Sequence, residues 1–203
     1  MVRKMTVRGR IALLALCPLV ACSEAARPAT QTLQTGVDQA ALRADIGPHV
    51  ADWPNSPRPT ETVTVGRPYG IFTVEKGPRL VFTDVWEVPI LSGTEYQVTA
   101  AVVRKGDIYE IDSMGSAELA ALLGEREKIP SVSSALDQGR AGLLRPVDYG
   151  GGELLAYEVD GPAYPGNIRV QPLDVGYSFF AGLDASADGL PDASLAEING
   201  ALP

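Results

Sequence analysis

Oxygen-bearing side chains recur at short intervals near the end of the chain, in the segment DASADGLPD at 184–192. The candidate ligands are Asp184, Ser186, Asp188 and Asp192. Small residues between them would let one turn direct these oxygens inward, and Gly189 would supply the bend, so one interpretation is a calcium site. The simpler interpretation is a solvated turn in which Asp192 caps a following helix.

The same segment resembles the DxDxDGxxD calcium loops of EF-hand-like and thrombospondin-type repeats. It departs from them where Ser186 replaces a carboxylate and where Leu195 occupies the twelfth position, at which an EF-hand carries a bidentate Glu. Glu197 comes two residues too late for that role. The resemblance implies calcium, and we expect no other cofactor.

A second group of carboxylates, Asp107, Glu110 and Asp112, lies in the segment DIYEID. On an alternating strand Glu110 and Asp112 share one face, where paired carboxylates could carry out acid–base hydrolysis, as in glycosidases. A solvated sheet face has the same pattern and is the simpler interpretation. Because the chain has no G-x-S-x-G or S-x-x-K motif, a serine hydrolase would need unmarked residues.

His49 is the only histidine, and it lies between Asp45 and Asp52 in the pattern D-x₃-H-x₂-D. These residues could form part of a metal site or a base with its orienting carboxylate. No nucleophile is near them in the sequence, so an exposed linker histidine is the simpler interpretation. The glycines at 150–152 lack the pattern of a phosphate-binding loop and indicate a hairpin or hinge.

Cys22 suggests a different chemistry, which is lipid attachment. Basic residues precede an apolar run at 11–21. This run is shorter than the roughly 20 residues that a membrane-spanning helix needs, so it is typical of an export signal. The end of the run, Leu19-Val20-Ala21-Cys22, resembles the lipobox of bacterial lipoprotein precursors. Cys17 does not fit this motif, because the bulky Leu16 precedes it.

The lipobox resemblance implies that residues 1–21 are a signal peptide and that Cys22 receives lipid chains, palmitate among them. Ser23 stands where Asp would favour inner-membrane retention, so in a Gram-negative source we expect the outer membrane. Two or three acyl chains would hold the protein on the membrane permanently. The alternatives are an ordinary secretory signal cleaved near Ala21 or Ala25, or a buried amphipathic helix.

The charge of the chain excludes some partners. Its 203 residues carry a net charge of −8, which becomes −12 when the four basic residues of 1–21 are removed. Such a chain is repelled by phosphate backbones, so we expect no nucleic acid partner. Only Cys22 would remain after processing, which leaves no disulfide and no cysteine-based zinc site.

The remaining sequence predicts one α+β domain over 37–203, after a flexible tether over 22–36. A helix over 37–46, ended by Gly47-Pro48, leads into a Pro-rich connector that reaches residue 60. The core over 61–203 begins with period-two strand segments at 62–65, 69–76, 79–88, 95–104 and 107–112.

Helices and further strands follow. We expect a helix that Ser116 caps and Gly124 ends, and a weaker helix over 132–138. Strand signals return at 153–159, 168–173 and 176–182. A terminal helix over 193–199 would begin with a capping box of Ser194 and Glu197. The fold class is therefore α+β, mainly an antiparallel meander with a few short helices on one face.

These features favour a lipid-anchored protein of the cell envelope, outside the cytoplasm and facing the periplasm or the surface. We expect a non-catalytic accessory module that binds a protein or cell-wall partner, and not an enzyme, because no catalytic set of residues is present. A small-ligand or calcium-binding module is the first alternative, and a carboxylate-based hydrolase is the second.

Overall fold

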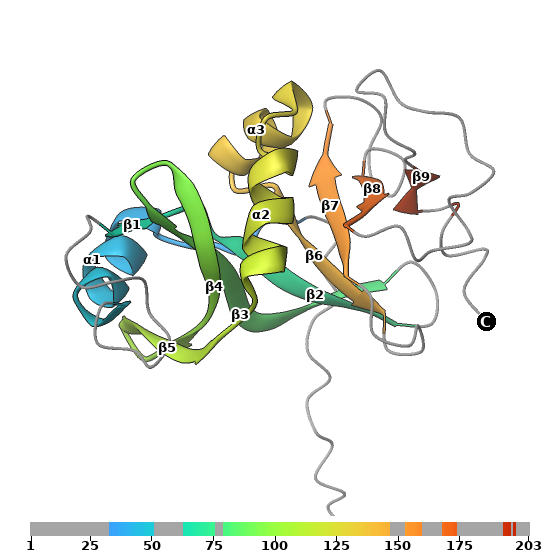
Figure 1. Cartoon of the computed structure of the whole chain (residues 1–203). Coiled ribbons are helices and arrows are strands. Elements are labelled where there is room, and N and C mark those ends of the chain that lie inside the picture. Colours follow the sequence, from blue (N-terminus) through green and yellow to red (C-terminus); the bar gives the residue numbers. More distant parts are fainter. Residues whose placement is uncertain are drawn as a thin grey trace, which may run out of the picture.

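The computed structural model describes residues 33–50, 63–75, 79–146, 153–159, 168–173, 193–195 and 197, which form one nine-stranded sheet and three helices (Figure 1). The strands are β1 (Val63–Val65), β2 (Tyr69–Glu75), β3 (Arg79–Ser92), β4 (Glu95–Lys105), β5 (Ile108–Met114), β6 (Ala141–Pro146), β7 (Leu154–Glu158), β8 (Ile168–Pro172) and β9 (Ala193–Ser194). The helices are α1 (Gln39–Val50), α2 (Ala117–Arg126) and α3 (Pro130–Asp137).

The sheet is a meander extended by a second group of strands. From β2 to β5 each strand pairs antiparallel with the next. The chain then passes through α2 and α3, and β6 returns to pair with β2 in parallel. β7, β8 and β9 add antiparallel strands beyond β6, while β1 pairs with β3. The predicted α+β class with a mostly antiparallel sheet is confirmed, whereas the parallel β2–β6 pair was not predicted.

Both faces of the sheet are apolar and both are covered. Leu143 of β6 and Leu155 of β7 point to the face that α2 and α3 cover. Their neighbours Leu144 and Leu154 point to the opposite face. Phe82 joins that opposite cluster to the one that α1 covers. Strands buried on both faces need cover on both, so α1 lies on one face while α2 and α3 share the other, as Figure 1 shows. The prediction that the helices lie on one face is therefore wrong.

α1 is longer than its sequence predicts, because it continues through Gly47 and Pro48 to Val50. Its buried residues Leu42, Ile46 and Val50 are four positions apart and form one apolar stripe. Burial of Val50 contributes about 1.5–3 kcal/mol, which offsets the backbone hydrogen bond that Pro48 cannot make. The prediction that Gly47-Pro48 ends this helix is therefore wrong.

α2 begins as predicted but does not end as predicted. The Ser116 Oγ accepts a hydrogen bond from the Leu119 N–H at 2.9 Å, which confirms the N-cap. Gly124, however, lies inside the helix. A Cβ atom at Gly124 would fall 2.3 Å from Cε2 of Tyr96, so this glycine allows the ring on β4 to approach the helix backbone. Gly124 thus serves packing and not termination.

The domain begins earlier than its sequence predicts. Leu33 is fully buried, and its N–H donates to Oε1 of Glu158 at 2.6 Å. Two residues on, the Thr35 hydroxyl accepts a hydrogen bond from Nε1 of Trp86 at 3.0 Å. The part of the predicted tether at 33–36 therefore packs on the sheet through Leu33 and Thr35. A flexible tether can apply only before Leu33.

Some of the predictions for the C-terminal half of the chain can be compared with the structure. α3 agrees with the helix predicted over 132–138. The capping box is confirmed, since the Ser194 N–H donates to Oε2 of Glu197 at 2.7 Å and the Glu197 N–H donates to Oγ of Ser194 at 3.3 Å. The strand predicted over 176–182 lies outside the described residues. No helix in the described ranges is long and apolar enough to span a membrane.

Candidate functional site

Two sets of predicted site residues lie outside the part of the chain that the structure describes. They are the lipobox with its lipidation residue Cys22, and the calcium loop with Asp184, Ser186, Asp188 and Asp192. Lipid attachment and calcium binding therefore stay predictions. Within the described ranges, no group of three or more His, Cys, Asp or Glu side chains could hold a metal ion.

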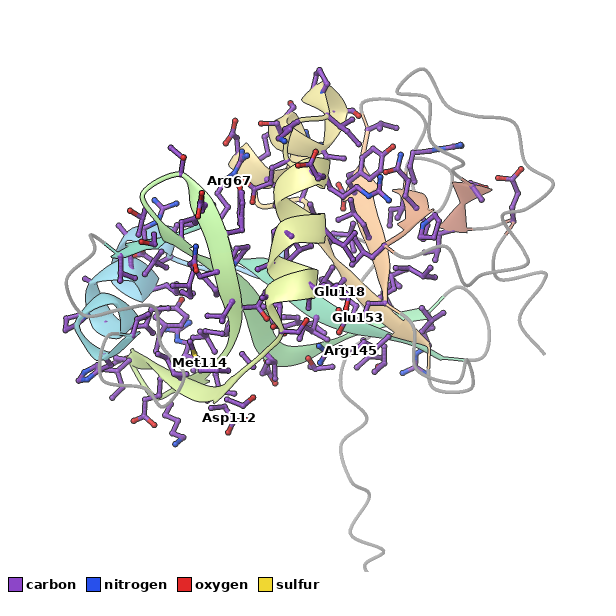
Figure 2. The ribbon with its side chains drawn as sticks, viewed as in Figure 1. Arg67, Asp112, Met114, Glu118, Arg145 and Glu153 are labelled. Carbon is purple, nitrogen blue, oxygen red and sulfur yellow. The ribbon has the colours of Figure 1, made fainter. Side chains whose placement is uncertain are left out.

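The carboxylates proposed for hydrolysis lie on an edge strand of the sheet. They belong to β5, which pairs only with β4 among the described strands. Oε2 of Glu110 is 2.6 Å from Nζ of Lys105, and both side chains are exposed. Asp112 is also exposed (Figure 2). An exposed carboxylate already paired with a lysine is a weak general acid or base, so this geometry does not support the hydrolase alternative.

His49 and Asp45 occupy α1 and not a linker. Oδ2 of Asp45 accepts a hydrogen bond from the Tyr109 N–H at 2.9 Å, so this side chain ties the helix to the outer edge of β5. His49 lies one helical turn further on and is exposed. Asp52, the third residue of the predicted triplet, lies outside the described residues.

A groove separates α1 from β5. Its volume is about 530 Å³, which falls in the size range of ligand sites. The apolar part of its lining comes from Ile46, Ile108, Tyr109 and Ile111, and the polar part from Asp45, His49 and Glu110. The groove thus combines an apolar wall with a few polar groups, which is the usual make-up of a binding site.

Ile108 marks the mouth of this groove. It is 51% exposed and is the only large hydrophobic residue exposed in the described ranges. Tyr109, next to it, is buried and stacks edge-on against Trp86, with ring centroids 5.5 Å apart. The sequence does not reveal this site because its two walls lie about 60 residues apart in the chain. The one local signal is the isolated apolar Ile108 directly after the charged segment at 104–107.

A second polar cluster lies on the opposite face of the sheet, near the start of α2. Arg145 of β6 bridges two carboxylates, since its Nη2 lies 3.3 Å from Oε2 of Glu87 and its Nε lies 2.6 Å from Oε1 of Glu153. Figure 2 shows the guanidinium of Arg145 beside Glu153. Burial raises the pKa of Glu87 and the charge of Glu153 adds to that rise, while the nearby Thr99 hydroxyl and the charge of Arg145 oppose it.

The Glu87 cluster has the composition of a catalytic site but not its openness. Glu87, on β3, is 3% exposed, and its neighbours are the Arg145 guanidinium of β6 and the Thr99 hydroxyl of β4. Neither Glu87 nor Arg145 lines the groove between α1 and β5. We interpret the cluster as an ion pair between the buried Glu87 and the exposed Arg145, which joins the two halves of the sheet.

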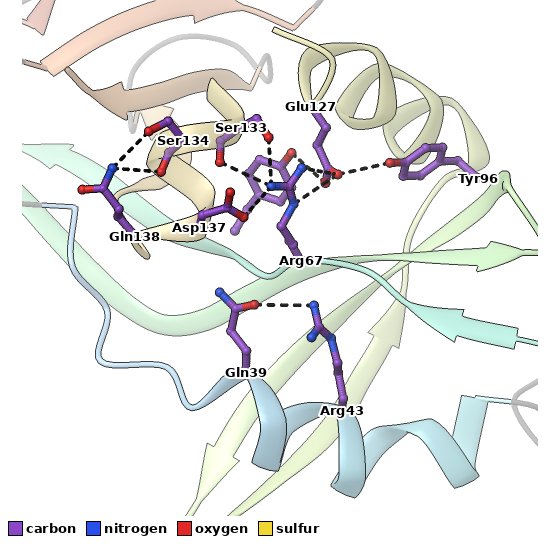
Figure 3. A network of polar contacts seen from close by, with 10 residues as sticks. Gln39, Arg43, Arg67, Tyr96, Glu127, Ser133, Ser134, Asp137 and Gln138 are labelled. Carbon is purple, nitrogen blue, oxygen red and sulfur yellow. Dashed lines mark hydrogen bonds and ion pairs between the residues drawn. The ribbon is translucent and has the colours of Figure 1, made fainter. Parts of the chain in front are cut away.

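A third network, shown in Figure 3, fastens the helical crossover to the sheet. Arg67, in the connection between β1 and β2, places Nη2 3.0 Å from Oε2 of Glu127 and Nη1 2.9 Å from Oδ1 of Asp137. The Tyr69 and Tyr96 hydroxyls donate to the same Glu127 carboxylate at 3.1 and 3.2 Å. Every polar group named here already has a partner, so the network is structural.

The comparisons with known proteins leave the site to be interpreted on its own geometry. No family model matches the chain, and neither the curated proteins nor the solved structures include a significant match. Of the three arrangements described above, only the groove between α1 and β5 is open to a ligand.

Proposed function

We propose that this protein is a lipid-anchored, non-catalytic module of the bacterial cell envelope that binds a protein or cell-wall partner through the groove between α1 and β5. The observation that carries the proposal is the coincidence of that groove with Ile108, a large apolar side chain left exposed at an edge strand. Exposed apolar surface at the mouth of a groove is typical of binding sites.

The lipid anchor would hold the domain close to the membrane. Leu33, the first described residue, is buried in the core and lies eleven positions after the lipidation residue Cys22. A chain of that length spans at most about 40 Å when fully extended. A partner would therefore be met near the membrane, which fits an accessory role at the periplasmic side of the outer membrane.

Lipid attachment is tested by replacing the predicted acceptor. In cells fed radiolabelled palmitate, the wild-type protein is expected to carry label and to sediment with the membranes. Cys22→Ala is expected to lose the label completely, because the thiol that accepts the lipid is gone. Cys17→Ala is the matched control and should keep both properties. An unlabelled wild-type protein would contradict the lipoprotein proposal and favour an ordinary secretory signal.

Partner binding is tested at Ile108. A photoactivatable phenylalanine analogue at position 108 is expected to form a discrete cross-linked band with an envelope component in living cells, because position 108 lies at the groove mouth. The same analogue at Ala121, an exposed residue of α2 on the other face, is the control and should give no such band. Equal cross-linking at both positions, or at neither, would contradict the proposal.

A small-ligand module is the alternative that the groove volume also supports. If the groove binds a small molecule, the analogue at position 108 is expected to form no cross-link to a protein or cell-wall component. Calcium binding would use residues 184–192 and so stays a separate prediction.

A further inference from the structure

We infer that the groove between α1 and β5 recognises a short peptide segment of a partner in which an apolar side chain adjoins a lysine or arginine. This inference rests on the proposed function and names the chemistry of its partner. It follows from three features of the groove, which are its isoleucines, its carboxylates and the way the edge of β5 is already occupied.

The isoleucines require an apolar group in the ligand. Ile46 closes the α1 side of the groove and is almost fully buried, whereas Ile108 on β5 is half exposed. Ile111 also lines the groove and is partly buried. A Leu, Ile or Val side chain placed here would remove the exposed part of Ile108 from water, which is favourable at roughly 25 cal/mol per Å² of apolar surface.

The carboxylates require a cation beside that apolar group. Asp45 is fixed through Oδ2 by the Tyr109 N–H, which leaves its Oδ1 to accept from a ligand. Glu110 lies across the groove and is held by Lys105 at 2.6 Å. Lys105 is 66% exposed, so an incoming ammonium or guanidinium can replace it at Glu110 at small cost. The net charge of −8 adds a general attraction for basic partners.

The edge of β5 limits how the peptide can bind. The Tyr109 N–H points away from β4, and it is already bonded to Asp45 on α1. A partner strand therefore cannot pair along the whole edge of β5, because the helix occupies this position. Recognition must instead come from side chains that enter the groove, so the segment is short and its side chains carry the specificity.

The inference can be tested by fluorescence anisotropy with the purified full-length protein and three labelled, end-capped hexapeptides. One alternates Leu and Lys, one alternates Leu and Glu, and one alternates Ser and Lys. The Leu–Lys peptide is expected to bind at least tenfold more tightly than either of the others. Only this peptide offers both an apolar side chain to the isoleucines and a cation to the carboxylates of the groove. A tenfold difference corresponds to about 1.4 kcal/mol.

Variants then locate the binding. Ile108→Ser and Glu110→Gln are each expected to weaken binding of the Leu–Lys peptide about tenfold. The first substitution removes the apolar contact, and the second removes the charge that pairs with the lysine. Lys105→Ala is expected to tighten it severalfold, because this substitution frees Glu110. Asp112→Asn is the matched control, since it removes a charge from β5 outside the groove lining, and it should leave affinity unchanged.

Equal binding of the Ser–Lys and Leu–Lys peptides would overturn the inference, because it would show general attraction between charges. So would stronger binding of the Leu–Glu peptide, or equal losses in Glu110→Gln and Asp112→Asn. If none of the three peptides binds while position 108 still cross-links to a component in cells, the inference fails and the proposed function stands. If both experiments fail, the proposed function fails as well.

Discussion

Replacing Leu33 by Ala is expected to lower the free energy of unfolding by about 2–5 kcal/mol. Leu33 is fully buried and packs in the cluster that includes Phe72, Leu144 and Ile168. Truncation would leave a cavity there, and the N–H bonded to Glu158 would lose the packing that holds it in place. The shift would be measured by urea unfolding, monitored by circular dichroism.

The matched control is Arg43→Ala on α1, an exposed residue whose side chain donates a hydrogen bond to Gln39 one turn earlier in the helix. Its effect should stay within about 0.5 kcal/mol. If Leu33→Ala were equally mild, residues 33–36 would belong to the flexible tether after all. A large loss would place the start of the folded domain at or before residue 33 and shorten the reach of any lipid anchor accordingly.

Replacing Glu127 by Ala is expected to destabilise the domain by about 2–4 kcal/mol. The Glu127 carboxylate accepts from Arg67, Tyr69 and Tyr96, and all four side chains are buried or partly buried. Its removal would leave one cation and two hydroxyls without their acceptor at the turn between α2 and α3. Urea unfolding measures the loss. Glu125→Ala is the control, because Glu125 is exposed and pairs with the exposed Lys128.

Glu127→Gln adds a readout that depends on charge. Burial and the negative charge of Glu127 raise the pKa of Tyr96 to about 12. Because the folded state then holds a proton that the unfolded state releases near pH 10, stability falls as the pH rises from 10 to 12. Glu127→Gln is expected to lower the pKa of Tyr96 in an absorbance titration. An unchanged titration would show that Glu127 does not act on this hydroxyl.

The sequence determined much of the local structure. Alternation of period two predicts the strands of the meander, and each predicted segment from 62 to 112 overlaps a strand from β1 to β5. The helix cap at Ser116 and the capping box of Ser194 and Glu197 follow from residues three positions apart. Such features are readable because the groups that interact are neighbours in the chain.

Residues that usually end a helix or indicate a flexible segment were less reliable guides, because packing against residues far away in the sequence can outweigh their local preference. Gly47-Pro48 does not end α1, since Val50 beyond it is buried against the sheet. Gly124 does not end α2, since the ring of Tyr96 needs the space that a side chain would fill. Leu33 was assigned to a tether by its polar neighbours, yet it lies in the core. In each case the deciding partner is far away in the sequence.

Only the tertiary structure decided where the site lies. The sequence by itself determined an α+β class, the strand and helix segments, an acidic surface, and the prediction of an export signal with a lipid acceptor at Cys22. The parallel pairing of β2 with β6, the two covered faces of the sheet and the groove between α1 and β5 join segments about 60 or more residues apart. Periodicity shows which residues of a helix or strand are buried, but long-range packing determines which other element covers them.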